Sequence, residues 1–367
     1  MKKLCAGLLS LLLGAAYAVA GPESAIDELI EQTGIEPGAT AMRDLPGWRA
    51  PTKVLIYQGW YIDPEFNTAV PGLEIVQAET LAEALIEAAD ADGIIGSCGN
   101  ELVNAARQAT WVQISSAGAE RCMQTDRIVS GEVVLTNMQK MSSPVIGEHA
   151  VAMALALARS LPQYAKKMDS GEWLDRDGAI GSAMQSVQGK TLLVAGLGGI
   201  GTEVARRAAA LGMRVVGTRR SSRNGPDFVE YVGLADELSE LAAGADFVVN
   251  ALPLTAETTG LFDADFFAAL KTGAHYISIG RGKTTNTDDL VAALKSGKVA
   301  GAGLDVTDPE PLPANHELWQ MQNVIITPHT AGKGSDRERH LTLLHENLRR
   351  FAAGEPLLNV VDPALGY

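Results

Sequence analysis

Three polar side chains in the last third of the sequence each follow an apolar segment. Arg281 follows AHYISIG, Glu310 follows VAGAGLDV and His329 follows NVIITP. The apolar segments predict strands, and in open α/β folds ligands bind at the carboxyl edge of the sheet. An arginine can hold a carboxylate through two hydrogen bonds. A histidine can transfer a proton near neutral pH, and a glutamate beside it stabilises the imidazolium.

A glycine-rich turn precedes these residues in the chain. The segment GLGGIG contains Gly196, Gly198 and Gly201, and it lies between the apolar TLLVA and the helical GTEVARRAAALG. In this context Gly196 allows a tight turn, Gly198 lets a pyrophosphate approach the amides of a helix N-terminus, and Gly201 lets helix and strand pack closely. The segment therefore predicts a dinucleotide-binding turn.

The residues that follow the next expected strand indicate whether NAD or NADP is the cofactor. Eighteen residues after Gly201, where an acidic side chain would bind the ribose hydroxyls of NAD, the sequence has Arg219, followed by Arg220, Ser221 and, two residues further, Arg223. A guanidinium can bind a 2'-phosphate, which a carboxylate would repel. NADP is the expected cofactor, and NAD is the alternative. The other interpretation of these arginines is a solvated basic loop that binds no phosphate.

Composition limits the class of protein. The chain has 367 residues, 46% of them hydrophobic, and a formal charge of -14 at pH 7. It is long enough for two domains with separate cores. An acidic chain is a poor ligand for phosphate backbones, so a small-molecule function is expected and a nucleic-acid partner is not.

The first twenty residues form a segment of a different kind. Lys2 and Lys3 precede the apolar run LCAGLLSLLLGAAYAVA, and Ala18 and Ala20 provide an A-x-A site. This layout predicts a signal peptide over residues 1–20 and an exported or periplasmic protein. An uncleaved membrane anchor is the alternative, and a cytoplasmic location follows if the segment is not a signal. No later segment is long and apolar enough to span a membrane.

Two cysteines, Cys98 and Cys122, remain after the expected cleavage. They could pair in an oxidising compartment, but two cysteines do not make a disulfide framework in a chain of this size. Unpaired, buried cysteines are therefore the expectation.

Strand and helix patterns alternate from residue 53 onwards, which predicts parallel sheets. Before them, PESAIDELIEQTG predicts a short helix that ends at Gly34, within an N-terminal extension over residues 21–50. Residues 144–164 are apolar on nearly every face and predict one long buried helix at a domain junction. His149 in this helix is expected to be a packed or interface residue, and the remaining histidines lack metal-ligand spacing, so no metal site is expected.

A series of segments runs through the chain in this order: SSAGAERCM, VIGEHAVAMALALARSLPQY, GLGGIG, ALPLTAETTGLF, SIGRG, GLDVTDPEPLP, LWQMQNVIITPHTAG, HENLRRFAAGEPLLNVVD and a terminal GY. In order and spacing the chain resembles the D-isomer-specific 2-hydroxyacid dehydrogenase family. The resemblance implies an α/β fold of two Rossmann-like domains. A doubly wound parallel-sheet NAD(P)-binding domain, residues 144–332, would be inserted into a flavodoxin-like substrate domain, residues 51–143 plus 333–367.

The resemblance also implies roles for individual residues. Arg281 would hold the substrate carboxylate and polarise the ketone, and His329 would be the acid or base with Glu310 as its partner. The expected cofactor contacts are Gly196, Gly198, Gly199, Ile200, Gly201, Arg219, Arg220, Ser221, Leu252, Pro253, Ile279, Arg281, Asp305 and His329. The expected substrate contacts are Ser97, Cys98, Ala117, Gly118, Arg281 and His329.

Two positions depart from the family pattern, Ser278 where an asparagine is usual and Glu120 where an aspartate is usual. Family members pair through the helix that corresponds to Val145–Tyr164, which implies a homodimer. The implied activity is hydride transfer between NADPH and a small 2-oxo acid of the glyoxylate or hydroxypyruvate type. The alternatives are a catalytically silent dinucleotide-sensing protein of this fold, or a dehydrogenase of phosphoglycerate or formate.

Overall fold

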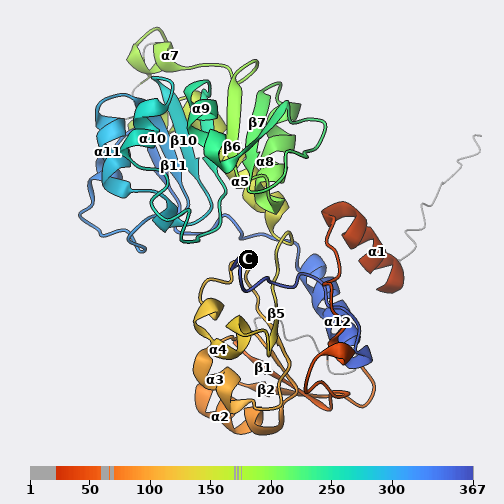
Figure 1. The fold of residues 1–367 in the computed structure, drawn as a ribbon. Helices are drawn as coiled ribbons and strands as arrows, with labels where there is room; N and C mark the ends of the chain where they lie inside the picture. Colours follow the sequence, from red (N-terminus) through yellow and green to blue (C-terminus); the bar gives the residue numbers. More distant parts are fainter. Residues whose placement is uncertain are drawn as a thin grey trace, which may run out of the picture.

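Two lobes, each built on its own parallel sheet, make up the described part of the chain (Figure 1). The structure is a computed structural model that describes residues 22–58, 66, 70–168, 171, 173–174 and 176–366. The expected signal peptide lies outside these residues. None of the described helices is long and apolar enough to cross a membrane.

The first lobe contains a five-stranded parallel sheet with the strand order β2-β1-β3-β4-β5. Its strands are β1 Lys53–Tyr57, β2 Glu74–Ala78, β3 Gly93–Ile95, β4 Trp111–Gln113 and β5 Val134–Thr136. The helices α2 Leu81–Glu87, α3 Asn100–Ala105 and α4 Asp126–Val129 connect them. This strand order is flavodoxin-like, as expected, and its direction of winding reverses between β1 and β3.

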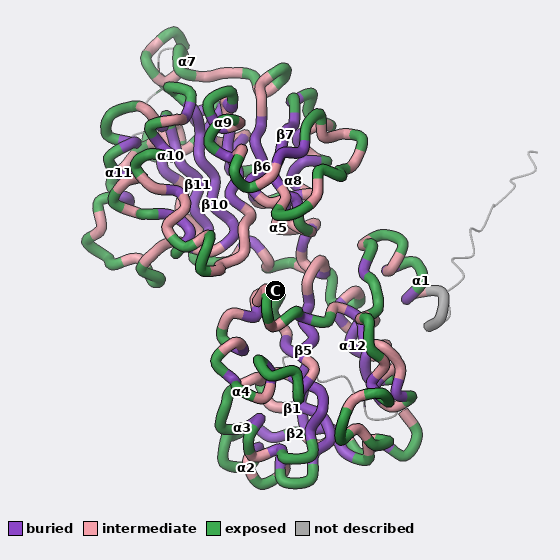
Figure 2. Tube along the Cα trace, in the orientation of Figure 1, coloured by how far each residue is buried: buried purple, intermediate pink, exposed green. Residues whose placement is uncertain are grey.

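The second lobe contains a seven-stranded parallel sheet with the order β12-β11-β10-β9-β6-β7-β8. Its strands are β6 Thr191–Ala195, β7 Arg214–Arg219, β8 Tyr231–Leu234, β9 Phe247–Asn250, β10 Ala274–Ser278, β11 Val299–Leu304 and β12 Val324–Ile326. The doubly wound order of a dinucleotide-binding domain is therefore present, with its switch point between β6 and β9. Both sheets form the buried centres of their lobes (Figure 2).

Helices cover both faces of the second sheet, as parallel sheets require. They are α5 Ser143–Ala158, α8 Gly199–Ala210, α9 Leu238–Ala243, α10 Ala264–Ala269 and α11 Thr287–Lys295. Two further helices, α6 Leu161–Met168 and α7 Ala179–Ala183, lie between α5 and β6 in the sequence. Short 3-10 helices complete the described elements: η1 Met42–Asp44, η3 Ala88–Asp90, η4 Cys122–Gln124, η5 Ala235–Glu237, η6 Gly282–Thr284 and η7 Glu317–Gln320.

The prediction of one helix over residues 144–164 is wrong, because two helices, α5 and α6, occupy this segment. The chain breaks at Ser160, whose φ is +53°. Pro162 explains the break: a proline has no N–H for the helical hydrogen bond and is tolerated only in the first turn of a helix. Here it is the second residue of α6.

The last helix, α12 Arg337–Ala353, returns the chain to the first lobe. The Asp336 side chain caps its N-terminus by accepting a hydrogen bond from the Glu338 amide, and Gly354, with φ +68°, ends it. Its buried face includes Leu344 and Phe351, which pack in the core of the first sheet. The chain therefore crosses between the lobes twice. The exact residues at which the two domains begin and end remain predictions.

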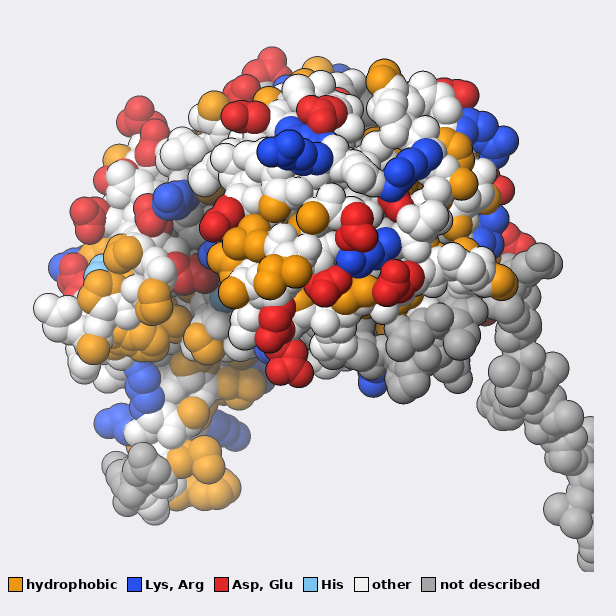
Figure 3. All heavy atoms as spheres, turned by 90° about the horizontal axis from the view of Figure 1, so that it is seen from below, with side chains coloured by type: hydrophobic (Ala, Val, Ile, Leu, Met, Phe, Trp, Pro, Cys, Tyr) orange, Lys and Arg blue, Asp and Glu red, His pale blue; other side chains and the backbone are white. Residues whose placement is uncertain are grey.

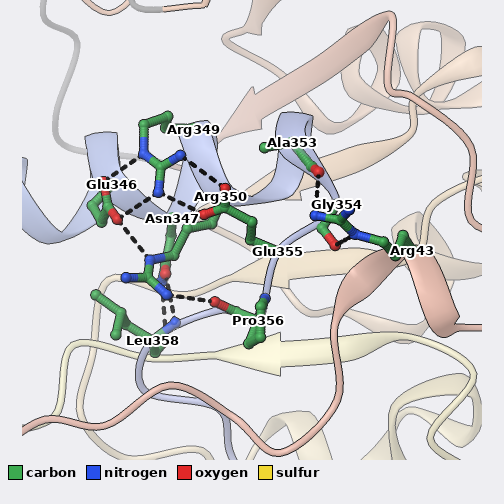
Figure 4. Close-up of polar contacts among 10 residues, drawn as sticks. All are labelled: Arg43, Glu346, Asn347, Arg349, Arg350, Ala353, Gly354, Glu355, Pro356 and Leu358. Carbon is green, nitrogen blue, oxygen red and sulfur yellow. Dashed lines mark hydrogen bonds and ion pairs between the residues drawn. The ribbon is translucent and has the colours of Figure 1, made fainter.

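The N-terminal extension is part of the first lobe. Its helix α1, Pro22–Thr33, ends at Gly34 as expected and packs against α12. Arg43 donates hydrogen bonds to the carbonyl oxygens of Gly354 at 2.9 Å and Ala353 at 3.1 Å, at the C-terminal end of α12 (Figure 4). On the face seen in Figure 3, acidic and basic side chains are intermixed with hydrophobic ones.

Candidate active site

The carboxyl edge of the second sheet brings the predicted site residues together. Six neighbouring strands in the order β12-β11-β10-β9-β6-β7 end at this edge. In the same order the first five are followed by His329, by Asp305 and Glu310, by Arg281, by Leu252 and by the glycine turn at Gly196, and β7 ends with Arg219. The titratable residues thus occupy one side of the switch point, and the glycine turn and Arg219 the other.

The glycine turn has the geometry that a pyrophosphate requires. Gly196 has φ +92°, and a Cβ on it would lie 2.9 Å from the side chain of Leu252. A Cβ on Gly201 would lie 2.0 Å from the Gly196 carbonyl oxygen, whereas no heavy atom comes within 4 Å of a Cβ built on Gly198. The turn is therefore tightly packed at Gly196 and Gly201 and open at Gly198. Gly198 lies beside the N-terminus of α8, whose first two residues are Gly199 and Ile200.

Arg219, the last residue of β7, and Arg223 have different surroundings. Arg223 forms an ion pair with Glu237 at 2.6 Å and donates a hydrogen bond to the Tyr231 hydroxyl. Hydrogen bonds, first among them that from Arg223, lower the pKa of Glu237 to about 2. By contrast, the Nε of Arg219 is buried and has no hydrogen-bond partner within the described ranges. A buried donor of this kind fits a ligand acceptor, such as a cofactor phosphate.

His329 and Glu310 form a pair at the other end of the edge. The Nδ1 of His329 lies 2.7 Å from the Oε1 of Glu310. About half of the His329 side chain is exposed, so Nε2 can meet a substrate while Nδ1 is held by the carboxylate. The backbone of His329 is left-handed, with φ +53°, which turns the side chain sharply away from the strand direction.

Asp305 organises the loop that carries His329. Its carboxylate is 3% exposed and accepts hydrogen bonds from the Thr327 hydroxyl at 2.6 Å and from the amides of Thr330 and Ala331. His149 on α5 contacts the Thr327 hydroxyl at 3.0 Å. Asp305, expected to meet the cofactor, thus positions the segment around His329, and His149 is a packed residue of the same network.

Arg281 joins the two lobes. Its Nε donates to the Glu120 carboxylate at 2.9 Å, and its Nη1 donates to the Gly280 carbonyl. A Cβ built on Gly118 would lie 1.7 Å from Nη2, so the guanidinium packs directly against this glycine. Burial acts to raise the pKa of Glu120, but the positive charge of Arg281, a backbone hydrogen bond and the hydrogen bond from Arg281 together hold the pKa below its usual value. Glu120, in the place of the usual aspartate, therefore remains a charged partner of Arg281.

A buried polar network beneath Arg281 was not predicted from the sequence. The Nδ2 of Asn250 at the end of β9 donates to the hydroxyls of Tyr276, Ser278 and Thr284. The Thr284 hydroxyl in turn donates to the Arg281 carbonyl at 2.6 Å. Ser278, the second departure from the family pattern, belongs to this network, which fixes the turn that presents Arg281. The sequence contained one signal for this network, because the apolar strands end in the polar residues Asn250 and Ser278.

The expected substrate loops are joined by a disulfide between Cys98 and Cys122, with the two Cα atoms 5.3 Å apart. The expectation of unpaired cysteines is therefore wrong. The reason is topological: Ser97 and Cys98 follow β3, and Ala117 and Gly118 follow its neighbour β4. Residues 24 positions apart in sequence thus meet at one sheet edge.

The expected cleft-lining residues after β9 and β10 differ in exposure. Leu252 packs over Gly196, and Pro253 accepts a hydrogen bond from Thr258 through its carbonyl oxygen. Ile279 is 4% exposed and lies in the core between the sheet and α5. Its side chain therefore does not line a cleft, and only its backbone could reach a cofactor.

Comparisons with known proteins agree with this geometry. Residues 151–331 match the family model of the NAD-binding domain of D-isomer specific 2-hydroxyacid dehydrogenases. The glyoxylate/hydroxypyruvate reductase B of Salmonella typhimurium is 32% identical over 308 residues, which are 81% of this chain and 91% of the relative. The human glyoxylate reductase/hydroxypyruvate reductase is 39% identical over 57% of this chain and 64% of its own.

Solved structures show the same fold over most of the chain. A D-isomer specific 2-hydroxyacid dehydrogenase from Xanthobacter autotrophicus, in complex with NADPH, superimposes with a TM-score of 0.74 at 28% identity and covers 87% of this chain and 100% of its own. The NADPH-dependent glyoxylate/hydroxypyruvate reductase of Sinorhizobium meliloti has a TM-score of 0.73 at 27% identity over 86% of this chain and 100% of its own. The chain belongs to the D-isomer specific 2-hydroxyacid dehydrogenase family, whose members are NAD(P)-dependent oxidoreductases.

Proposed function

We propose that this protein is an NADPH-dependent reductase of a small 2-oxo acid of the glyoxylate or hydroxypyruvate type. One arrangement carries the proposal: Arg281, Glu310 and His329 follow three neighbouring strands, and the Nδ1 of His329 lies 2.7 Å from the Glu310 carboxylate. The names of the relatives support the substrate class, and the NADPH and NADP in the related structures support the cofactor.

The residues have separate tasks in this proposal. Arg281 binds the substrate carboxylate and polarises the ketone, together with the amides of the Gly118 loop. His329 donates a proton from Nε2 to the ketone oxygen while Glu310 stabilises the imidazolium through Nδ1. A bound reduced nicotinamide would supply the hydride. The turn from Gly196 to Gly201 and the orphaned Arg219 donor are the groups that would hold the cofactor.

A panel of 2-oxo acids assayed with NADPH and with NADH tests the proposal. We expect turnover of glyoxylate or hydroxypyruvate with NADPH as the better cofactor. A purified protein that binds NADPH but reduces no 2-oxo acid would favour a dinucleotide-sensing protein, and turnover confined to phosphoglycerate or formate would assign another dehydrogenase of this fold.

Arg219 should set the cofactor preference. Arg219→Ser is expected to raise the KM for NADPH about 10- to 100-fold, since about one or two charge-assisted hydrogen bonds to the 2'-phosphate are lost. The KM for NADH should stay within about twofold, because NADH has no 2'-phosphate. Arg223→Ser is the matched control, because Arg223 is already paired with Glu237. Equal losses with both cofactors would contradict the assignment.

The homodimer is a proposal with support from exposed apolar side chains. In the segment that follows α5, Leu161 is 52% exposed, Met168 76% and Trp173 99%. Large exposed apolar side chains concentrated in one segment of the chain are typical of interfaces. Sedimentation at micromolar concentration should give the mass of a dimer, and Leu161→Asp should shift it to a monomer. A monomeric wild-type protein would refute this proposal.

Export is likewise proposed, on the signal-like residues 1–20 and the Cys98–Cys122 disulfide, a bond typical of oxidising compartments. The native protein should begin at Gly21 and contain no free thiol. Met1 intact in a cytosolic fraction would contradict export. An exported chain would have to obtain its cofactor outside the cytoplasm, because no twin-arginine motif precedes the apolar run.

A further inference from the structure

Lys140 lies across the phosphate-binding turn without being part of it. It belongs to the segment that connects β5 to α5, and its Cγ lies 2.8 Å from the point that a Cβ on Gly199 would occupy. Gly199 is the first residue of α8. The side chain of Lys140 therefore passes directly over the helix N-terminus that meets the pyrophosphate in this fold.

The ammonium of Lys140 is held from the other side by the N-terminal extension. Its Nζ donates a hydrogen bond to the Gly34 carbonyl at 2.7 Å, just past the end of α1. An ammonium has three N–H donors, and Gly34 is its hydrogen-bond acceptor among the described residues. The other two N–H groups have no acceptor among the described residues and are available to a ligand, and the extension contacts the ammonium through Gly34.

The backbone of Lys140 is in a conformation that favours glycine. Its φ is +71°, in the left-handed region that residues with a Cβ rarely adopt. Such conformations cost free energy and are found where the surrounding structure holds them, often at functional sites. A lysine here accepts a backbone penalty that glycine would avoid, which indicates a task for the side chain.

The charged groups around Lys140 do not neutralise its ammonium. Burial lowers the pKa of Lys140, the carboxylate of Glu36 opposes that effect, and the guanidinium of Arg219 lowers the pKa further. The positive end of the α8 dipole also points at this position. Glu36 is exposed and belongs to the extension. A phosphate bound between Gly199 and Arg219 would supply the missing negative charge.

We propose that Lys140 binds a phosphate of the dinucleotide, as a cationic contact in addition to the glycine turn and Arg219. The inference rests on the proposed NADPH-dependent function. It adds to the phosphate site a side chain that comes from the connection between the lobes and is oriented by the N-terminal extension, which ties cofactor binding to a part of the chain outside the cofactor domain.

Binding measurements on the full chain test the inference without turnover. Titration of NADPH, NADH and adenosine 2',5'-bisphosphate would be compared in the wild type, Lys140→Met, Lys140→Gly and Lys140→Arg. We expect Kd for NADPH to rise about tenfold in the Met and Gly variants, the value of about one charge-assisted hydrogen bond, and to be largely restored by Arg. Lys298→Met is the matched control, because Lys298 precedes β11 at the opposite edge of the sheet.

Each outcome has one meaning. Lys140→Gly removes the side chain and its backbone penalty together, so Tm should not fall while binding weakens. Parallel losses for NADPH and NADH place Lys140 on the pyrophosphate, and losses confined to NADPH and the bisphosphate place it on the 2'-phosphate; both support the inference. A lowered Tm with unchanged Kd values would overturn it in favour of a structural clamp to Gly34. A wild type that binds neither dinucleotide would refute the proposed function itself.

Discussion

Replacing His329 by asparagine should lower kcat for 2-oxo acid reduction by about 10²- to 10⁴-fold, the usual contribution of a general acid. The Kd for NADPH should stay within about twofold, because the groups proposed to bind the cofactor's phosphates lie at the other end of the sheet edge. Asparagine is the substitution of choice because His329 has φ +53°, and asparagine tolerates this left-handed conformation better than most residues. Stopped-flow measurement of NADPH oxidation separates the chemical step from binding.

Two matched variants define the cause of the loss. Glu310→Gln keeps a side chain of the same size but removes the charge that stabilises the imidazolium, so a smaller loss of kcat is expected than for His329→Asn. His316→Asn replaces a histidine that caps the 3-10 helix η7, a position that asparagine also fills well, and should leave kcat unchanged. A His329→Asn variant with wild-type kcat would show that the proton comes from elsewhere.

The sheet edge could be predicted from the sequence because its signals are local. Apolar runs ending in Arg281, in Asp305 and in His329 are each read from fewer than ten neighbouring residues. Parallel pairing then places their ends on one edge without any knowledge of distant contacts. The glycine turn is local in the same sense. The strand order 2-1-3-4-5 of the first sheet follows from the family resemblance, not from periodicity.

Features that depend on contacts between distant residues were not predictable in the same way. The Cys98–Cys122 pair depends on β3 and β4 being neighbours, and the Arg281–Glu120 contact depends on how the lobes meet. The contact of Lys140 with Gly34 depends on where the extension packs. The break at Ser160 is different, because Pro162 was visible in the sequence and the continuous apolar pattern outweighed it in the prediction.

The three unpredicted contacts share one consequence for function. Glu120, the disulfide and Lys140 all connect a site residue or loop to a segment outside the second sheet. The second lobe alone carries the proposed general acid, His329, and the glycine turn. The first lobe and its extension contact Arg281 and Lys140. The specificity of this enzyme for its acid and its cofactor should therefore be sensitive to changes in the first lobe.

Arg281 should also contribute to the stability of the contact between the lobes. Burial raises and the charge of Arg281 lowers the pKa of Glu120, with a net decrease. A carboxyl group whose pKa is lowered on folding stabilises the fold above its unfolded pKa of about 4.3, and this stabilisation is lost as pH falls through the lower folded value. Arg281→Met should therefore lower Tm at pH 7, and this loss of Tm should become smaller as pH falls below about 4.3.

The catalytic effect of Arg281 is expected to be as large as that of His329. Arg281→Met removes about two charge-assisted hydrogen bonds to the substrate, each about 1.5–3 kcal/mol, which should lower kcat/KM for the 2-oxo acid by about 10²- to 10⁴-fold. Arg281→Lys keeps the charge but not the planar fork, so only part of the activity should remain.

Gly118→Ala tests the same site from the other lobe, because its Cβ would lie 1.7 Å from the Arg281 Nη2. The guanidinium must then move away from the substrate loop, so we expect KM for the acid to rise while the Kd for NADPH stays unchanged. Ser116→Ala is the matched control in the same loop, because it removes only a hydroxyl that donates to the Gly118 carbonyl. Wild-type kinetics in both Arg281→Met and Gly118→Ala would mean that the substrate carboxylate binds elsewhere. Losses in both, with the Ser116 control intact, would place it between the two lobes.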